Sequence, residues 1–128
     1  MEITQAVAPW LFGAAGLITL SMLQAVVAPA AALRAYFGEQ TDAPGLLAIV
    51  RNWGAGIAAC GGLLLAAAFL PDLRVAAAVF AIVTKLAFVA LVLGPGRSAA
   101  QRQARLAVVF DVVVVALLGA WLVARVVA

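Results

Sequence analysis

The chain has 128 residues, of which 68% are hydrophobic and only 10% charged, and its mean hydropathy is +1.22. A soluble domain carries about 25% charged residues, so this composition excludes an ordinary soluble domain and predicts an integral membrane protein. The net charge of +3 comes with no basic stripe and no interleaved aromatic residues, which argues against nucleic-acid binding.

Four apolar segments follow one another along the chain, at about residues 7–27, 46–70, 75–93 and 105–127. Each is close to the roughly 20 residues that a bilayer core requires. The polar stretches "FGEQTDAPG", "PDLR" and "GPGRSAAQRQ" separate them. We expect the first helix to continue past Pro29 through "AAALRAY". The sequence therefore predicts an all-α polytopic membrane protein, a single domain built as a bundle of four transmembrane helices.

The arginines that flank these segments predict the orientation of the bundle. An even number of spans places both termini on one side of the membrane. The opposite side, called the far side here, has Arg34, Arg97, Arg102 and Arg105, and the side of the termini has Arg74 and Arg125. Because basic residues favour the cytoplasm, we predict non-cytoplasmic termini in a bacterial inner membrane. The opening "MEITQAVAPW" begins with an acid instead of a positive region, so we do not read the first span as a signal peptide.

The residue types that are missing limit the chemistry. The sequence has no histidine, which is the commonest protein metal ligand and the commonest general base, so we predict no metal and no cofactor. Cys60 is the single cysteine and lies within an apolar helix, so a disulfide framework is excluded. We interpret it as a small packing residue.

Three charged residues fall inside the apolar segments: Arg51, Lys85 and Asp111. At about 1.5 Å per helical residue, Arg51 and Asp111 lie about 8 and 9 Å from the far side, and Lys85 about 13 Å. A charge at such a depth costs at least about 2.5–3.5 kcal/mol and is usually paired or faces a cavity. Because Asp111 is the single acid within the apolar segments and Arg51 is the base nearest its depth, we predict an Arg51–Asp111 ion pair. Lys85 would then leave a net positive site, suited to an anionic or oxygen-rich group.

Neutral polar side chains gather in the same half of the predicted bundle, and we take them as candidate substrate-binding residues. They are Ser21, Gln24, Asn52, Trp53 and Thr84. On the second span, Arg51 shares a helical face with small residues that allow close helix packing, so it should point into the bundle. These small residues are Gly54, Ala55, Ala58 and Gly62. A structural interpretation stands beside each of these: the basic side chains extend to the membrane surface, the ion pair only joins helices, and the tryptophan packs.

The layout resembles small four-span bacterial membrane proteins, most of which have no assigned activity. The resemblance rests on "VVAPAAALRAYFG", "RNWGAGIAACGGLLL" and "LPDLR", and it implies a fold but no catalytic residue. Small multidrug transporters match poorly, because they carry an acid in the first span and the first span of this chain has none. The four-span eicosanoid and glutathione enzymes match in the second span only as "RN".

Three functions fit these observations. The first is a cofactor-independent enzyme that acts on a lipophilic small molecule in the bilayer by isomerisation, epoxide opening or cyclisation. Asp111 would transfer the proton, while Arg51, Lys85 and Asn52 would hold a substrate oxygen. The alternatives are an accessory or structural subunit, as a homo-oligomer or with a membrane partner protein, and a small transporter.

Overall fold

The computed structural model describes residues 2–95, 102 and 104–127, and all regular elements in these ranges are helical. Within these ranges, four stretches are long and apolar enough to cross a membrane, and they indicate an integral membrane protein. They are Ile3–Val27, Pro44–Phe69, Pro71–Val92 and Arg105–Val127. The predicted all-α fold, a bundle of four such helices, is therefore confirmed.

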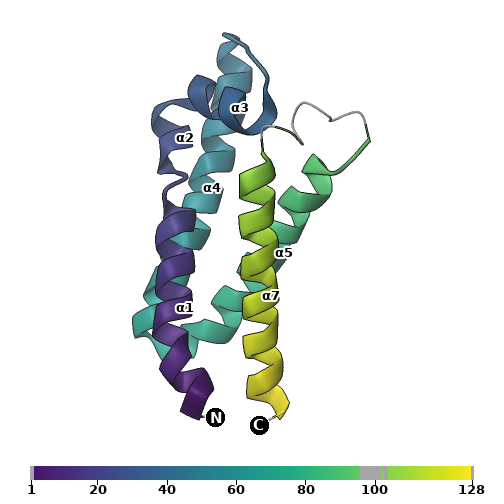
Figure 1. The fold of residues 1–128 in the computed structure, drawn as a ribbon. Coiled ribbons are helices and arrows are strands. Elements are labelled where there is room, and N and C mark those ends of the chain that lie inside the picture. The colour runs from purple at the N-terminus through teal and green to yellow at the C-terminus, as the bar shows by residue number, and fades with distance from the viewer. Residues whose placement is uncertain (1, 96–101, 103, 128) are drawn as a thin grey trace.

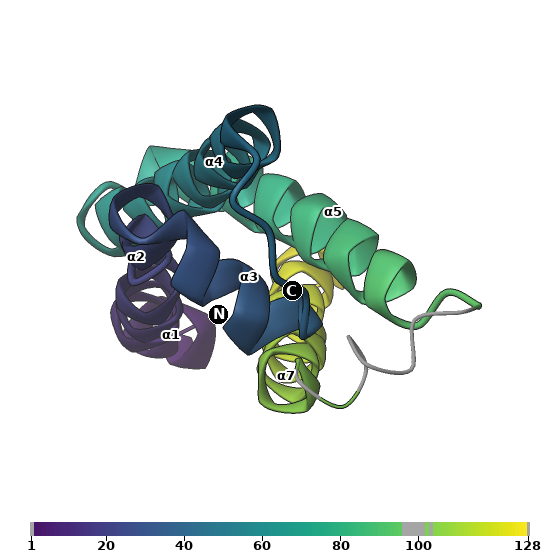
Figure 2. The ribbon, with the colours of Figure 1, turned by 90° about the horizontal axis from the view of Figure 1, so that it is seen from above.

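The elements run up and down in chain order (Figure 1). They are α1 (Glu2–Leu20), α2 (Leu23–Val27), α3 (Pro29–Phe37), α4 (Pro44–Phe69), the 3₁₀ helix η1 (Pro71–Leu73), α5 (Arg74–Val92) and α7 (Arg105–Val127). Both termini lie at one end of the bundle, called the terminal end here, and α3 lies across the other, the loop end (Figures 1 and 2). Arg97, one of the arginines used to predict the orientation, lies outside the described residues.

Glycines hold α1 and α4 in close contact. A Cβ atom added at Gly16 would lie 2.5 Å from the backbone nitrogen of Leu65, and one at Gly61 would overlap the backbone of Leu20. At Gly54 the nearest atom would be a Cβ of α2, also at 2.5 Å. A Cβ at Gly62, in contrast, meets nothing within 4 Å. The predicted small-residue stripe is therefore rotated: the seam runs through Gly54 and Gly61, and not through Gly62.

Apolar packing closes the terminal half of the bundle. The rings of Phe12 and Trp121 meet edge to face with centroids 5.1 Å apart, and Leu64 and Leu118 are fully buried beside them. The indole nitrogen of Trp121 donates a hydrogen bond to the carbonyl of Thr4, at 3.1 Å. These contacts join α1, α4 and α7, so the space between the helices is filled at this end.

A buried arginine satisfies the end of α4. The side chain of Arg74 donates from Nε to the carbonyl of Ala67 at 2.9 Å and from Nη2 to that of Ala68 at 3.0 Å. The last carbonyls of a helix have no partner within the helix itself. Arg74 therefore donates to carbonyls at the end of α4 the hydrogen bonds that water would donate at an exposed helix end.

The first span is broken at Ala28. The stretch "AAALRAY" is helical, as predicted, but it belongs to the separate helix α3 and does not continue the first span. Pro29 has no N–H to donate, and Ala28 before it is non-helical, with φ −132° and ψ 69°. A second break separates α1 from α2, where the nitrogen of Met22 bonds to the carbonyl of Thr19 in the tighter i to i+3 pattern. The chain beyond Ala28 is therefore free to turn, and α3 crosses the loop end of the bundle (Figure 2).

Candidate functional site

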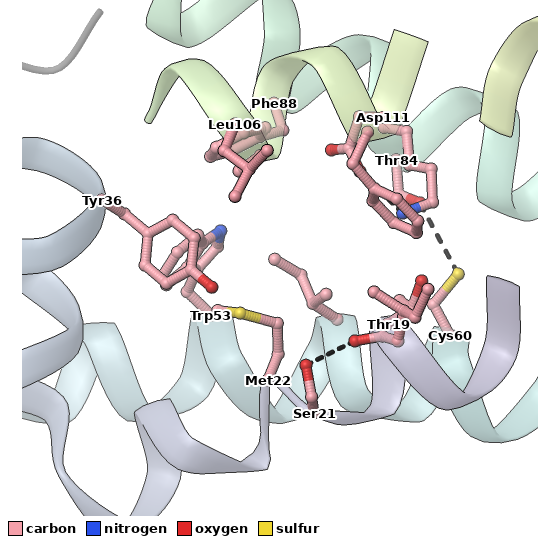
Figure 3. A pocket seen from close by; sticks show the side chains of 15 residues that line it. Thr19, Ser21, Met22, Tyr36, Trp53, Cys60, Thr84, Phe88, Leu106 and Asp111 are labelled. Carbon is pink, nitrogen blue, oxygen red and sulfur yellow. Dashed lines mark hydrogen bonds and ion pairs between the residues drawn. The ribbon is translucent and has the colours of Figure 1, made fainter. Parts of the chain in front are cut away.

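A cavity of about 470 Å³ lies between the helices toward the loop end of the bundle. Its walls come from the end of α1, from α3, α4 and α5, and from the first half of α7 (Figure 3). Most of the wall is apolar or aromatic, with Ile18, Met22, Ile57, Phe88, Leu106 and Phe110 among its residues. A few polar groups interrupt it, a combination typical of sites for small lipophilic molecules.

The polar centre of the cavity is an ion pair between α5 and α7. Lys85 Nζ lies 2.8 Å from Asp111 Oδ1, and the two side chains are only 6% and 13% exposed. The ammonium group also lies 4.9 Å from the ring centroid of Phe110, a cation–π contact. Because the carboxylate neutralises the ammonium charge, this part of the wall carries no net charge.

The predicted Arg51–Asp111 pair is wrong. Arg51 is exposed, and its Nε donates to the carbonyl of Val26 at 3.2 Å. This carbonyl lies next to the break at Ala28, where the helical ladder is interrupted. In a membrane helix a carbonyl that loses its helical partner needs another donor. Arg51 therefore satisfies the backbone at a helix break, and the net positive site expected from Lys85 does not form.

The other predicted site residues divide into two groups. Ser21, Trp53 and Thr84 line the cavity together with Lys85 and Asp111. Arg51, Gln24 and Asn52 are exposed and are not among its lining residues. Gln24 still acts on the site indirectly, because its amide nitrogen donates to the hydroxyl of Tyr36 at 3.2 Å.

Tyr36 is one lining residue that the sequence reasoning missed. It belongs to α3, which was expected to extend the first span and instead covers the loop end of the cavity. Its ring meets Trp53 edge to face at 5.9 Å, and Trp53 stacks on Phe88 at 6.1 Å. Tyr36 is the only tyrosine of the chain, and its amphipathic ring next to a predicted loop was the available signal.

Thr19 and Cys60 are further lining residues that the sequence reasoning missed, and both are buried. Cys60 Sγ lies 3.8 Å from the hydroxyl oxygen of Thr84 (Figure 3). Thr19 is 3% exposed, and its hydroxyl oxygen has no hydrogen-bond partner within the described part of the chain. No sequence signal distinguished Thr19, because its state depends on its neighbours in space.

Two chemical capabilities follow from this arrangement. The carboxylate of Asp111 keeps a second oxygen that can accept a proton or a hydrogen bond, and the ammonium of Lys85 keeps further protons to donate. Across residues 2–95, 102 and 104–127, no group of three or more cysteine or acidic side chains is placed to hold a metal ion. The site thus offers a paired acid and base in a largely apolar pocket.

Comparison of the chain with protein-family models, with curated proteins and with solved structures finds no match. The resemblance to small four-span bacterial proteins stays a prediction. The case for a function consequently depends on the geometry of the cavity.

Proposed function

We propose that this protein binds a lipophilic small molecule inside the membrane and performs cofactor-independent acid–base chemistry on it, of the isomerase or cyclase type. One observation carries the proposal: a buried Lys85–Asp111 pair, 2.8 Å apart, forms part of the wall of a largely apolar cavity of about 470 Å³. A charged pair is costly to keep inside a membrane protein and commonly marks a functional site.

The two groups have complementary roles in this chemistry. For a double-bond isomerisation beside a carbonyl, Asp111 removes a proton from the carbon next to the carbonyl. Lys85 meanwhile donates a hydrogen bond to the oxygen that gains negative charge. Asp111 then returns the same proton to a carbon further along the conjugated system, so substrate and product have equal mass. The largely apolar wall lowers the local dielectric constant, which strengthens both interactions.

The proposal is tested with purified protein in lipid nanodiscs. The protein is incubated with a membrane lipid extract, and products of unchanged mass but altered chromatographic retention are sought by mass spectrometry. We expect wild-type protein to convert at least one lipophilic compound and Asp111→Asn to convert it at least about 100-fold more slowly, the usual contribution of a general acid–base group. Asp72→Asn is the matched control, because Asp72 is exposed in η1 and away from the cavity. Equal turnover by wild type and Asp111→Asn would refute the proposal.

The accessory-subunit alternative draws on a different observation. Helix α7 is the least buried of the four spans. One stretch of it carries exposed apolar side chains, namely Val109, Val112, Val113 and Leu117. A partner helix or a second copy of the chain would cover these side chains as effectively as lipid does. Native mass spectrometry from nanodiscs decides between these cases, and a single copy with full turnover would rule out the subunit.

The transporter alternative has less support in the geometry. A transported molecule needs a path to the opposite surface, whereas the packed rings of Phe12 and Trp121 fill the terminal half of the bundle. Uptake into proteoliposomes that depends on Asp111 would favour the transporter over the enzyme.

We also propose that the protein lies in a bacterial inner membrane, with the loop end facing the cytoplasm and both termini on the non-cytoplasmic side. Arg34 and Arg105 flank the loop end, with Arg74 and Arg125 toward the other end. The larger number of flanking arginines in the whole sequence favours the loop end as the cytoplasmic side. Reporter fusions to the C-terminus test the orientation, and a fusion that reports a cytoplasmic location would reverse it.

A further inference from the structure

The hydroxyl of Thr19 departs from the usual behaviour of threonine in a helix. A helical threonine normally donates its hydroxyl proton to a carbonyl three or four residues earlier. Thr84 does so, with its oxygen 3.0 Å from the carbonyl of Phe80 and 3.1 Å from that of Ala81. Thr19 lies in the last turn of α1, is 3% exposed, and makes no such bond among the described residues.

Thr19 is also one of the residues that line the cavity, although its hydroxyl oxygen is itself buried. Thr19 is in the wall contributed by α1, and Figure 3 shows it across the open space from Asp111 and Thr84. A buried polar group without a partner destabilises the fold, and most such groups in native proteins are satisfied. A molecule bound in the cavity with an oxygen at this depth would supply the missing partner.

The charges of the wall restrict what that oxygen can be. Lys85 is paired with Asp111, and Arg51 lies outside the cavity, so among the described residues no unpaired cation lines it. An anionic head group would lie close to the carboxylate of Asp111 without a free positive charge to balance it. A neutral hydroxyl or carbonyl oxygen can accept a hydrogen bond from Thr19 or Lys85 without this repulsion.

From these three observations we infer that Thr19 anchors the ligand, and that the ligand is a lipophilic molecule with a neutral hydroxyl or carbonyl group at its deep end. Its apolar body lies along the aromatic wall formed by Trp53, Phe88 and Phe110. This inference rests on the proposed function, since it names the class of molecule that the same cavity takes. It makes Thr19 a specificity-determining residue.

Three probes with the same apolar body test the inference: 1-pyrenebutanol, butylpyrene and 1-pyrenebutanoate. Binding to protein in nanodiscs is measured by energy transfer from tryptophan to pyrene, with Trp53 in the cavity wall and with empty nanodiscs subtracted. We expect wild type to bind the alcohol roughly 3- to 10-fold more tightly than the hydrocarbon, the range of one net hydrogen bond. The carboxylate should bind more weakly than the alcohol. Thr19→Val should remove the preference for the alcohol, and Thr19→Ser should retain it.

Thermal unfolding of the ligand-free protein provides a second measurement, in which the loss of the Thr19 hydroxyl should be favourable instead of unfavourable. Thr19→Val removes an unsatisfied hydroxyl and should raise the unfolding temperature, whereas Thr84→Val removes a bonded hydroxyl and should not. A lower unfolding temperature for Thr19→Val, or the same probe preference in Thr19→Val and wild type, would overturn the inference. Lack of saturable binding by every probe would overturn it too. The proposed function is judged separately, by the turnover of Asp111→Asn.

Discussion

Removal of one partner of the Lys85–Asp111 pair is the sharpest perturbation that the structure offers. Asp111→Asn leaves the ammonium of Lys85 buried, with 6% of its side chain exposed and no carboxylate at 2.8 Å. Loss of one partner of a buried ion pair costs about 3–5 kcal/mol, chiefly because the other charge stays unpaired. The contact of Lys85 with the Phe110 ring, at 4.9 Å, offsets about 0.5–2 kcal/mol of this.

A double-mutant cycle separates the pair from its surroundings. We expect Asp111→Asn to lower the free energy of unfolding by about 1–4.5 kcal/mol, the range above less the cation–π contribution. Lys85→Met also removes the cation–π contact, so we expect it to cost the full range of about 3–5 kcal/mol. The double variant has no uncompensated charge, so it should cost little more than either single change, with a coupling energy of at least about 2 kcal/mol. The free energies are measured by equilibrium unfolding in mixed micelles.

Snorkelling of Lys85 toward the membrane surface would give a different result. A flexible lysine whose ammonium reaches water loses little when Asp111 becomes neutral. The buried pair would be refuted if the costs of the two single changes simply add in the double variant. A cost below about 1 kcal/mol for Asp111→Asn, the range of an exposed pair, would refute it as well.

Two further predictions concern the rest of the bundle. Gly61→Ala should lower the free energy of unfolding by about 1–3 kcal/mol, because the added Cβ overpacks against the backbone of α1. Gly62→Ala should be neutral or stabilising, because its Cβ meets nothing within 4 Å. Equal effects in the same unfolding assay would contradict the glycine seam. Arg51→Met should cost about 1 kcal/mol, the bond to the carbonyl of Val26, and should leave the Lys85–Asp111 coupling energy unchanged. A reduced coupling energy in this variant would return Arg51 to the site.

The sequence by itself determined the fold class and the presence of charged residues within the spans. Long apolar stretches must satisfy their backbone groups internally, so in a membrane they become helices, and their number and length can be counted along the chain. The same count places Lys85 and Asp111 within the spans. Depth along a helix axis depends only on residue number, so the same count also places Arg51 within a span. It does not report which of these residues the other helices bury, and Arg51 is exposed.

Only the tertiary structure decided which residues meet. Arg51 and Asp111 share a depth, but α4 packs on α1 and α2 through its glycines while α5 packs along α7. The acid therefore meets the lysine of its own neighbour, and Arg51 meets the helix break at Ala28. Which helices are neighbours depends on close packing around the bundle axis, a direction that hydropathy does not report.

The unsatisfied hydroxyl of Thr19 illustrates the same limit at the level of one atom. Thr19 and Thr84 are the same residue type in similar apolar surroundings, and hydropathy treats them alike. Thr84 bonds to its own helix, while the hydroxyl of Thr19, a residue of the cavity wall, has no partner in the part of the chain that the structure describes. Whether a buried group has a partner depends on side-chain rotamers and on atoms brought together from several helices, and these exist only in the folded bundle.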